Sequence, residues 1–122
     1  MSGRFSLRER IASFGPALRG VLTLLRETHN ARIHALATVL VIGLGLYLEV
    51  SRQEWMVLVL TLALVWLAEG MNSALEYLCD AAVPEQHPLI GKAKDVAAGA
   101  VLICAGFAVV MAALVFGPYV LA

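Results

Sequence analysis

Charged residues are scarce in this sequence of 122 residues. Only 15% of the residues are charged, whereas 61% are hydrophobic, and none from Val96 to the C-terminus carries a formal charge. This composition excludes an ordinary soluble domain and indicates a small integral membrane protein. The N-terminal 32 residues also lack an uninterrupted apolar core with a cleavage site, so no signal peptide is expected and the first span itself would direct insertion.

Cysteine is nearly absent as well. Cys79 and Cys104 fall in or beside apolar stretches and do not show the spacing of metal ligands. We therefore expect two free thiols rather than a disulfide or a metal site.

Three apolar stretches are long enough to cross a bilayer as helices, and they cover residues 33–48, 55–78 and 96–117. Before them, apolar residues recur every three or four positions from Leu7 to Leu25, which predicts an amphipathic helix on the membrane surface, interrupted near Gly15 and Pro16. The predicted fold is an all-α membrane protein, with a cytoplasmic surface-helix region over 1–32 and a three-span catalytic region over 33–122.

The basic residues are distributed unevenly, and this sets the expected orientation. Six of the nine precede the first span, two lie between the second and third spans, and only Arg52 lies between the first and second. Because short basic segments stay in the cytoplasm, the N-terminus is expected inside and the C-terminus outside.

The second span ends in a cluster of polar residues, EGMNSALEYLCD. On a helix with 100° per residue, five of them fall within an arc of about 100°: Glu69, Asn72, Ser73, Glu76 and Asp80. Glu69 would lie about 21 Å along a helix that enters the bilayer at Trp55, a depth at which a carboxylate costs about 2 to 3 kcal/mol. The Glu69 and Glu76 backbones would be about 10 Å apart, so their carboxylates are expected to have different roles.

Other interpretations of this stripe are open at this point. The residues could form a solvated helix end or ion pairs that fix helix packing, or Glu69 and Glu76 could form the relay of a small oligomeric ion or proton transporter. A transporter would need a continuous polar path across the membrane, but the first and third spans have no ionisable residue in their outer halves. A non-catalytic scaffold would leave the polar segment 85–95 unexplained.

The segment after the stripe is also polar. Pro84 and Pro88 bracket Glu85, Gln86 and His87, which predicts a rigid loop. The motif KAKD at 92–95 is then expected to open the third helix, where free N–H groups and the helix dipole favour an anion next to a lysine. A lysine that only snorkels to the interface is the alternative.

Three motifs together resemble the bacterial integral-membrane diacylglycerol kinase family, including its undecaprenol kinase branch. They are E-x-x-N-[ST]-A-x-E-x-x-x-D at 69–80, E-x-H-P-L at 85–89 and A-K-D-x-A-A-x-A-V at 93–101. S-F at 13–14, A-L-R-G at 17–20 and N-A-R-I-H at 30–34 extend the resemblance over most of the chain. Like that family, the sequence has neither the P-loop nor the H-R-D motif of other kinases.

The resemblance implies an ATP- and Mg²⁺-dependent lipid kinase of the bacterial inner membrane, a homotrimer with active sites between protomers, acting on diacylglycerol or undecaprenol and without a nucleic-acid partner. It implies that Glu69 is the general base, that Asn72 and Lys94 contact the transferred phosphate, and that Glu76 binds metal and nucleotide. The remaining residues that it assigns are Glu85, Gln86, His87 and Asp95 at the nucleotide, and Ala98 at the substrate.

The sequence departs from the family pattern at two positions. The second metal-binding glutamate is expected six residues before His34, where this chain has Thr28, so the neighbouring Glu27 is the candidate ligand. Glu9 occupies the position expected for a nucleotide-contacting arginine, so Arg8 or Arg10 would take that role, and Arg10 is the candidate.

Overall fold

The computed structural model describes residues 3–122, so residues 1 and 2 of the predicted surface region lie outside it. It contains five helices in these residues: α1 (Leu7–Ala12), α2 (Phe14–Glu27), α3 (His29–Leu48), α4 (Arg52–Ala82) and α5 (Pro88–Leu121). The last three are long and apolar enough to cross a membrane. The prediction of an all-α membrane protein with three spanning helices and an N-terminal amphipathic helix is confirmed. The three long helices contain the predicted spans and extend beyond them.

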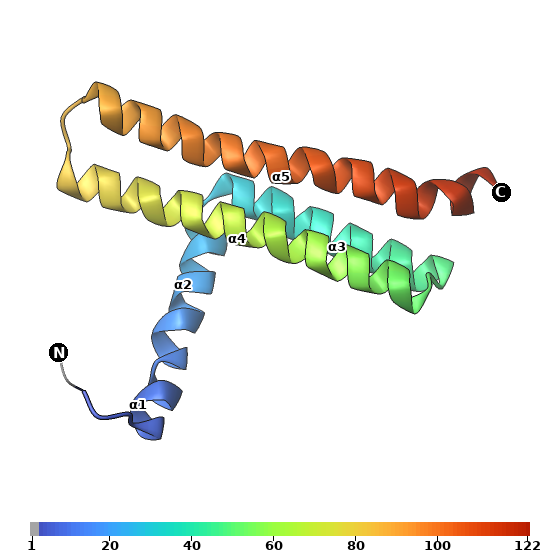
Figure 1. The fold of residues 1–122 in the computed structure, drawn as a ribbon, viewed down its shortest axis with the longest axis horizontal. Helices are drawn as coiled ribbons and strands as arrows, with labels where there is room; N and C mark the ends of the chain where they lie inside the picture. The colour runs from blue at the N-terminus through green and yellow to red at the C-terminus, as the bar shows by residue number, and fades with distance from the viewer. Residues whose placement is uncertain (1–2) are drawn as a thin grey trace.

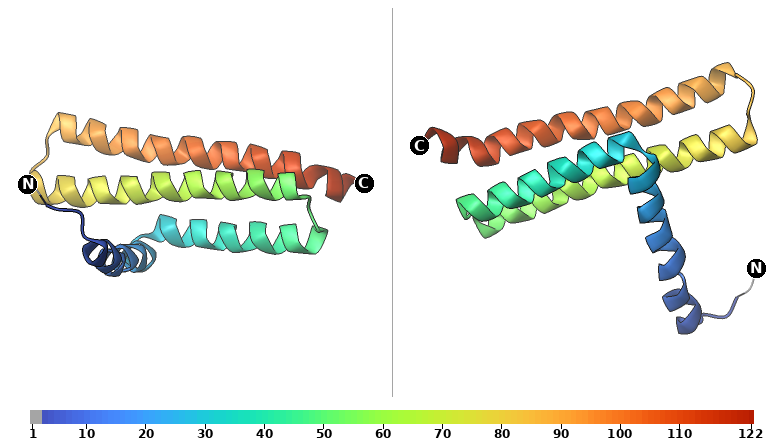
Figure 2. Two further views of the ribbon diagram at one scale, coloured as in Figure 1. Left: turned by 60° about the horizontal axis from the view of Figure 1, so that its bottom comes forward. Right: turned by 180° about the vertical axis from the view of Figure 1, so that it is seen from behind.

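The three long helices run side by side, and α2 leaves them at a steep angle (Figures 1 and 2). α4 and α5 pack along one another, and α3 lies against α4. α2 joins the bundle at the beginning of α3, and α1 lies at the distal end of α2 (Figure 1). This angle is the one that an amphipathic helix needs if it lies in the membrane plane while its neighbours cross it.

The N-terminal helix is divided at Ser13, between α1 and α2. Pro16 follows three residues later, and its ring would clash with the carbonyl of Ala12 in a continuous helix. The predicted interruption near Gly15 and Pro16 therefore occurs one turn earlier than the proline itself.

The corner between α2 and α3 is held by side chains that bind the free carbonyls at the end of α2. The Thr28 hydroxyl donates to the Leu24 carbonyl, and the Arg32 guanidinium donates to the carbonyls of Leu25 and Arg26. The last carbonyls of a helix have no partners within the helix, so these bonds both end α2 and fix the direction in which α3 leaves it.

The turn between α3 and α4 is compact because both helix ends are capped. The N–H of Val50 donates to the Gly45 carbonyl around Glu49, which has a left-handed backbone (φ 52°), as in a Schellman C-cap. Ser51 and Glu54 then form a capping box at the start of α4. The Tyr119 hydroxyl of α5 donates to Glu54 at 2.5 Å, so the ends of α4 and α5 are joined as well.

A small apolar core lies at this end of the bundle. Its buried residues are Val50, Leu58, Val115 and Phe116, with Trp55 packed against them. Most other large apolar side chains of the spanning helices are exposed, for example Val39, Leu60 and Phe107. Such faces are stable only against lipid or against another protein chain.

Gly45 is required where Trp55 crosses α3, and this gives a first prediction. A Cβ at residue 45 would lie 2.6 Å from the Trp55 ring, whereas a Cβ at Gly43 would have no neighbour within 4 Å. Gly45→Ala should therefore destabilise the protein by about 1–3 kcal/mol, because the indole must move out of the core. Gly43→Ala is the matched control and should be neutral or slightly stabilising. Thermal unfolding in detergent measures both variants, and equal melting temperatures for Gly45→Ala and Gly43→Ala would contradict the prediction.

The third spanning helix begins earlier than the sequence indicated. Pro88 is its first residue, and His87 is the N-cap, whose Nδ1 accepts from the N–H of Leu89 at 3.1 Å. Proline is well suited to the first turn because its missing N–H would have no helical partner there. Lys94 consequently lies in the second turn, and the expectation that it sits among the free N–H groups of the helix N-terminus is wrong. The predicted loop is confined to residues 83–87.

Candidate active site

Glu69 is the most completely buried large side chain of the described chain. Its exposure is 0%, and Asn72 and Ser73 on the same face of α4 are 7% and 4% exposed. The Ser73 hydroxyl donates to Glu69 Oε1 at 3.4 Å. A carboxylate in the apolar part of a spanning helix is costly, so its presence indicates a chemical role.

His34 of α3 provides the second polar contact of Glu69. Its Nε2 lies 3.3 Å from Glu69 Oε2, but the two groups are not aligned as a hydrogen bond, and Oε2 has no other donor within residues 3–122. The side-chain exposures of the two residues are 13% and 1%. The pair is therefore a close polar contact and not an aligned hydrogen bond in this structure.

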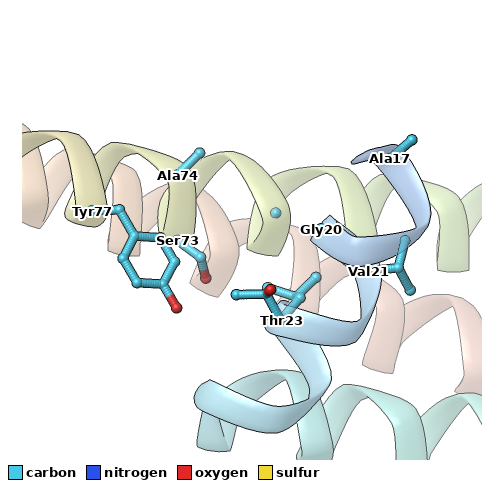
Figure 3. A pocket seen from close by; sticks show the side chains of 9 residues that line it. Ala17, Gly20, Val21, Thr23, Ser73, Ala74 and Tyr77 are labelled. Atoms are coloured by element: carbon cyan, nitrogen blue, oxygen red, sulfur yellow. The ribbon is translucent and has the colours of Figure 1, made fainter. Parts of the chain in front are cut away.

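A groove of about 440 Å³ lies between α2 and α4, and its lining includes Gly70 and Ser73 of α4 but not Glu69 itself. Figure 3 shows Thr23 of α2 facing Ser73 and Tyr77 of α4 across it. The other lining residues are small or apolar: Ala17, Gly20, Val21, Leu24, Gly70 and Ala74. Ser73 both lines the groove and contacts Glu69, so one side chain lies between the groove and the buried carboxylate.

Asn72 lies on the side of α4 that faces α5. It lines a hollow of about 360 Å³ together with Ala97 and Ala100 of α5. Its Oδ1 is buried and has no hydrogen-bond partner among the described residues. A buried amide oxygen without a partner costs about 1–3 kcal/mol, which is expected at a position that binds a ligand.

The loop end of α4 and α5 forms a polar hollow of about 540 Å³. The hollow is lined by Glu85, Gln86 and His87 from the loop and by Asp80 and Lys94 from the two helices. Lys94 Nζ lies 2.5 Å from Asp80 Oδ1, so this ion pair joins α4 to α5 at the rim. The structure thus brings together four of the residues expected at the nucleotide.

Glu27 contacts α4 at Tyr77, the residue that follows Glu76 in the sequence. The Tyr77 hydroxyl donates to Glu27 Oε1 at 2.9 Å, and Glu76 itself is partly buried. Thr28 points instead to its own helix, because its hydroxyl donates to the Leu24 carbonyl. Of these two neighbours, Glu27 is therefore the one whose oxygen is directed toward α4.

Three predicted site residues lie apart from these groups within one chain. Arg10 is exposed on α1, which Figure 1 places away from the bundle, and Asp95 and Ala98 are exposed on α5. Cys79 and Cys104, on α4 and α5, both carry free thiols.

The sequence pattern did not indicate a role for His34 or the contacts made by Tyr77 and Asp80. His34 and Glu69 are 35 positions apart, and Glu27 and Tyr77 are 50 apart. These pairs depend on the register between helices, which the sequence does not give. The sequence does contain a weaker signal for a polar contact at His34, because His34 and Thr38 are one turn apart on an otherwise apolar span.

Comparison with known proteins supports one family over nearly the whole chain. Residues 15–116 match the family of prokaryotic diacylglycerol kinases. An undecaprenol kinase of Bacillus subtilis is 35% identical over 115 residues, which cover 94% of both chains. A diacylglycerol kinase of Synechocystis is 38% identical over 88% of this chain and 62% of its own length, and one of Pseudomonas aeruginosa is 32% identical over 80% of both.

The family match covers nearly all of the described helices. The family match includes α2 from its second residue, the three spanning helices as far as Phe116, and with them the buried carboxylate, the groove and the polar hollow. The chain belongs to the prokaryotic diacylglycerol kinase family and is a lipid phosphotransferase of the diacylglycerol kinase and undecaprenol kinase type.

Proposed function

We propose that this protein transfers the γ-phosphoryl group of Mg-ATP to the hydroxyl of a membrane lipid alcohol. The product would be phosphatidic acid from diacylglycerol or undecaprenyl phosphate from undecaprenol. The observation that carries the proposal is the fully buried Glu69 carboxylate, whose contact Ser73 lines the groove between α2 and α4 and whose helix also contributes to the polar hollow.

The acceptor side is the groove between α2 and α4. Its apolar lining suits a lipid chain, and the hydroxyls of Thr23, Ser73 and Tyr77 can orient a polar head group. Glu69 would take the proton of the lipid hydroxyl as its oxygen attacks the γ-phosphorus. A general base must lie within hydrogen-bond reach of the alcohol, and the Ser73 contact places Glu69 one side chain away from the groove.

The donor side is the hollow at the loop end. Lys94 would contact phosphate as a point charge, and Glu85, Gln86, His87 and Asp95 would contact the rest of the nucleotide. Asn72 would donate its side-chain N–H to the transferred phosphate, and Ala98 would lie at the substrate. Phosphoryl transfer depends mainly on alignment and charge neutralisation, which these side chains supply.

Two carboxylates of the chain are the candidates for holding a magnesium ion. The described residues contain no group of three or more His, Cys, Asp or Glu side chains arranged for a metal. Mg²⁺ at a nucleotide needs only one or two carboxylates in addition to phosphate and water. Glu76 and Glu27 would hold it, and when bound it would neutralise charge on the phosphates. The direction of the Glu27 carboxylate toward α4 supports this assignment over Thr28.

Neighbouring copies would complete the site. Arg10 is separated from the hollow within one chain, and large apolar faces of the spanning helices are exposed. Both features support the homotrimer implied by the resemblance, with the site between protomers. The uneven distribution of basic residues along the chain supports insertion in the bacterial inner membrane with the N-terminus in the cytoplasm.

Lys94→Met should weaken ATP binding and slow transfer together, each by about tenfold or more, because a phosphate loses a charge-assisted contact. Lys92→Met is the matched control, since Lys92 is exposed two residues earlier on the same helix. Turnover at varied ATP and thermal melting with and without ATP measure both effects. A variant that melts earlier but binds ATP normally would show that Lys94 only pairs with Asp80.

The proposed activity is tested with purified protein in mixed micelles that contain diacylglycerol and a C55 polyprenol in equal amounts. With γ-labelled ATP and Mg²⁺, label should enter the lipid extract, and chromatography of the two phosphorylated products gives the preferred alcohol. Label in neither lipid, from protein that is folded and binds ATP, would overturn the proposal.

A further inference from the structure

We propose that His34 is a positioning residue that orients the Glu69 carboxylate through Nε2. This inference rests on the proposed role of Glu69 as the base. The structure shows two polar contacts to that carboxylate within residues 3–122: Ser73, on the same helix α4, contacts Oε1, and His34, on α3, contacts Oε2. The two oxygens therefore have different surroundings.

The position of the His34 ring is set by its neighbours on both helices. The ring meets Trp66 edge to face, with centroids 6.2 Å apart and an interplanar angle of 68°. Trp66 Nε1 in turn donates to Thr38 Oγ1 at 2.9 Å, and Thr38 Oγ1 donates to the His34 carbonyl at 2.7 Å. Aromatic contacts of this geometry are favourable, and the bonds fix the register of α3 against α4.

This arrangement assigns one role to each oxygen. Ser73 lines the groove, so Oε1 lies on the side from which a lipid hydroxyl would arrive. Oε2 lies on the α3 side, where the imidazole N–H can hold it. A neutral imidazole that carries its proton on Nε2 would be a sufficient donor once the contact, which is 3.3 Å long, is aligned.

The step itself keeps the histidine proton in place. Glu69 Oε1 accepts the hydroxyl proton, the lipid oxygen forms its bond to the γ-phosphorus, and the bond from that phosphorus to the bridging oxygen breaks with ADP as the leaving group. His34 keeps its N–H on Oε2 throughout. Its effect is to hold the carboxylate in the productive direction, and a misplacement of about 1 Å can cost about 10² in rate.

The test separates the nitrogen donor from the ring. His34→Phe keeps an aromatic edge against Trp66 but removes the donor, whereas His34→Gln places an amide N–H near the position of Nε2. His29→Phe is the matched control, because His29 is exposed at the start of the same helix. We expect His34→Phe to lower kcat by about tenfold or more with the KM for ATP unchanged, and His34→Gln to recover most of the loss.

A double-mutant cycle separates this inference from the proposed function. With Glu69→Gln already present, His34→Phe should cause little further loss, because there is no carboxylate base left to orient. Wild-type turnover in His34→Phe, equal losses in His34→Phe and His34→Gln, or independent multiplication of the two single losses would each overturn the role of His34. Retained turnover in Glu69→Gln alone would instead overturn the proposed base.

Discussion

Glu69→Gln is expected to lower phosphoryl transfer by about 10² or more while ATP affinity changes little. Glutamine keeps the size and hydrogen-bonding capacity of the side chain but cannot accept the proton of the lipid hydroxyl. The buried position of Glu69, away from the polar hollow where Lys94 lies, is the reason to expect that nucleotide binding is spared. Turnover at saturating lipid and ATP, measured beside ATP binding on the same sample, gives both quantities.

Asp80→Asn is a useful comparison for this variant because it also removes one carboxylate from α4. Asp80 is exposed and pairs with Lys94, so its loss should act on ATP binding more than on turnover. If Glu69→Gln instead lost ATP binding and turned over normally at saturation, Glu69 would belong to the nucleotide site and the proposed division along α4 would be wrong.

Glu76→Gln is expected to raise the Mg²⁺ concentration for half-maximal activity by about tenfold or more, the change produced by about 1.4 kcal/mol of lost binding. The chain offers few carboxylates near this position, so the loss of one should be felt strongly. Glu27→Gln should act in the same direction, because Tyr77 holds that carboxylate against α4. Activity titrated with Mg²⁺ at constant free ATP measures the effect.

Thr28→Glu tests whether the family position or its neighbour supplies the second carboxylate. The Thr28 hydroxyl is directed to the Leu24 carbonyl, so a glutamate there should leave the Mg²⁺ requirement unchanged or higher. A lower requirement in Thr28→Glu, with no effect of Glu27→Gln, would contradict the assignment of Glu27 and restore the family geometry.

The helices could be predicted because their signals are local. Long apolar runs and the spacing from Leu7 to Leu25 depend only on neighbouring residues, and the structure has helices over all of them. The start of α5 differs from the predicted one. The KAKD motif at 92–95 predicts a later start, but Pro88 with His87 as N-cap is the stronger start signal.

The candidate site could be predicted only along single helices. The sequence places Glu69, Asn72 and Ser73 on one polar stripe of α4, and all three are buried, whereas Asp80 of the same stripe is exposed. The hollow around residues 85–87 follows from the loop between two prolines. Contacts between helices depend on rotation and register, which a single sequence does not contain. The His34 contact with Glu69 and the Tyr77 bond to Glu27 are of this kind.

The most direct test of the whole account reconstitutes wild-type protein and Glu69→Gln in sealed vesicles that contain a lipid alcohol. Labelled phospholipid and ion flux are measured in the same preparation after addition of γ-labelled ATP. The account predicts Mg²⁺-dependent labelling of the lipid by the wild type, its loss in Glu69→Gln, and no flux in either. Labelling that persists in Glu69→Gln, or flux that requires Glu69 without any labelled lipid, would contradict it.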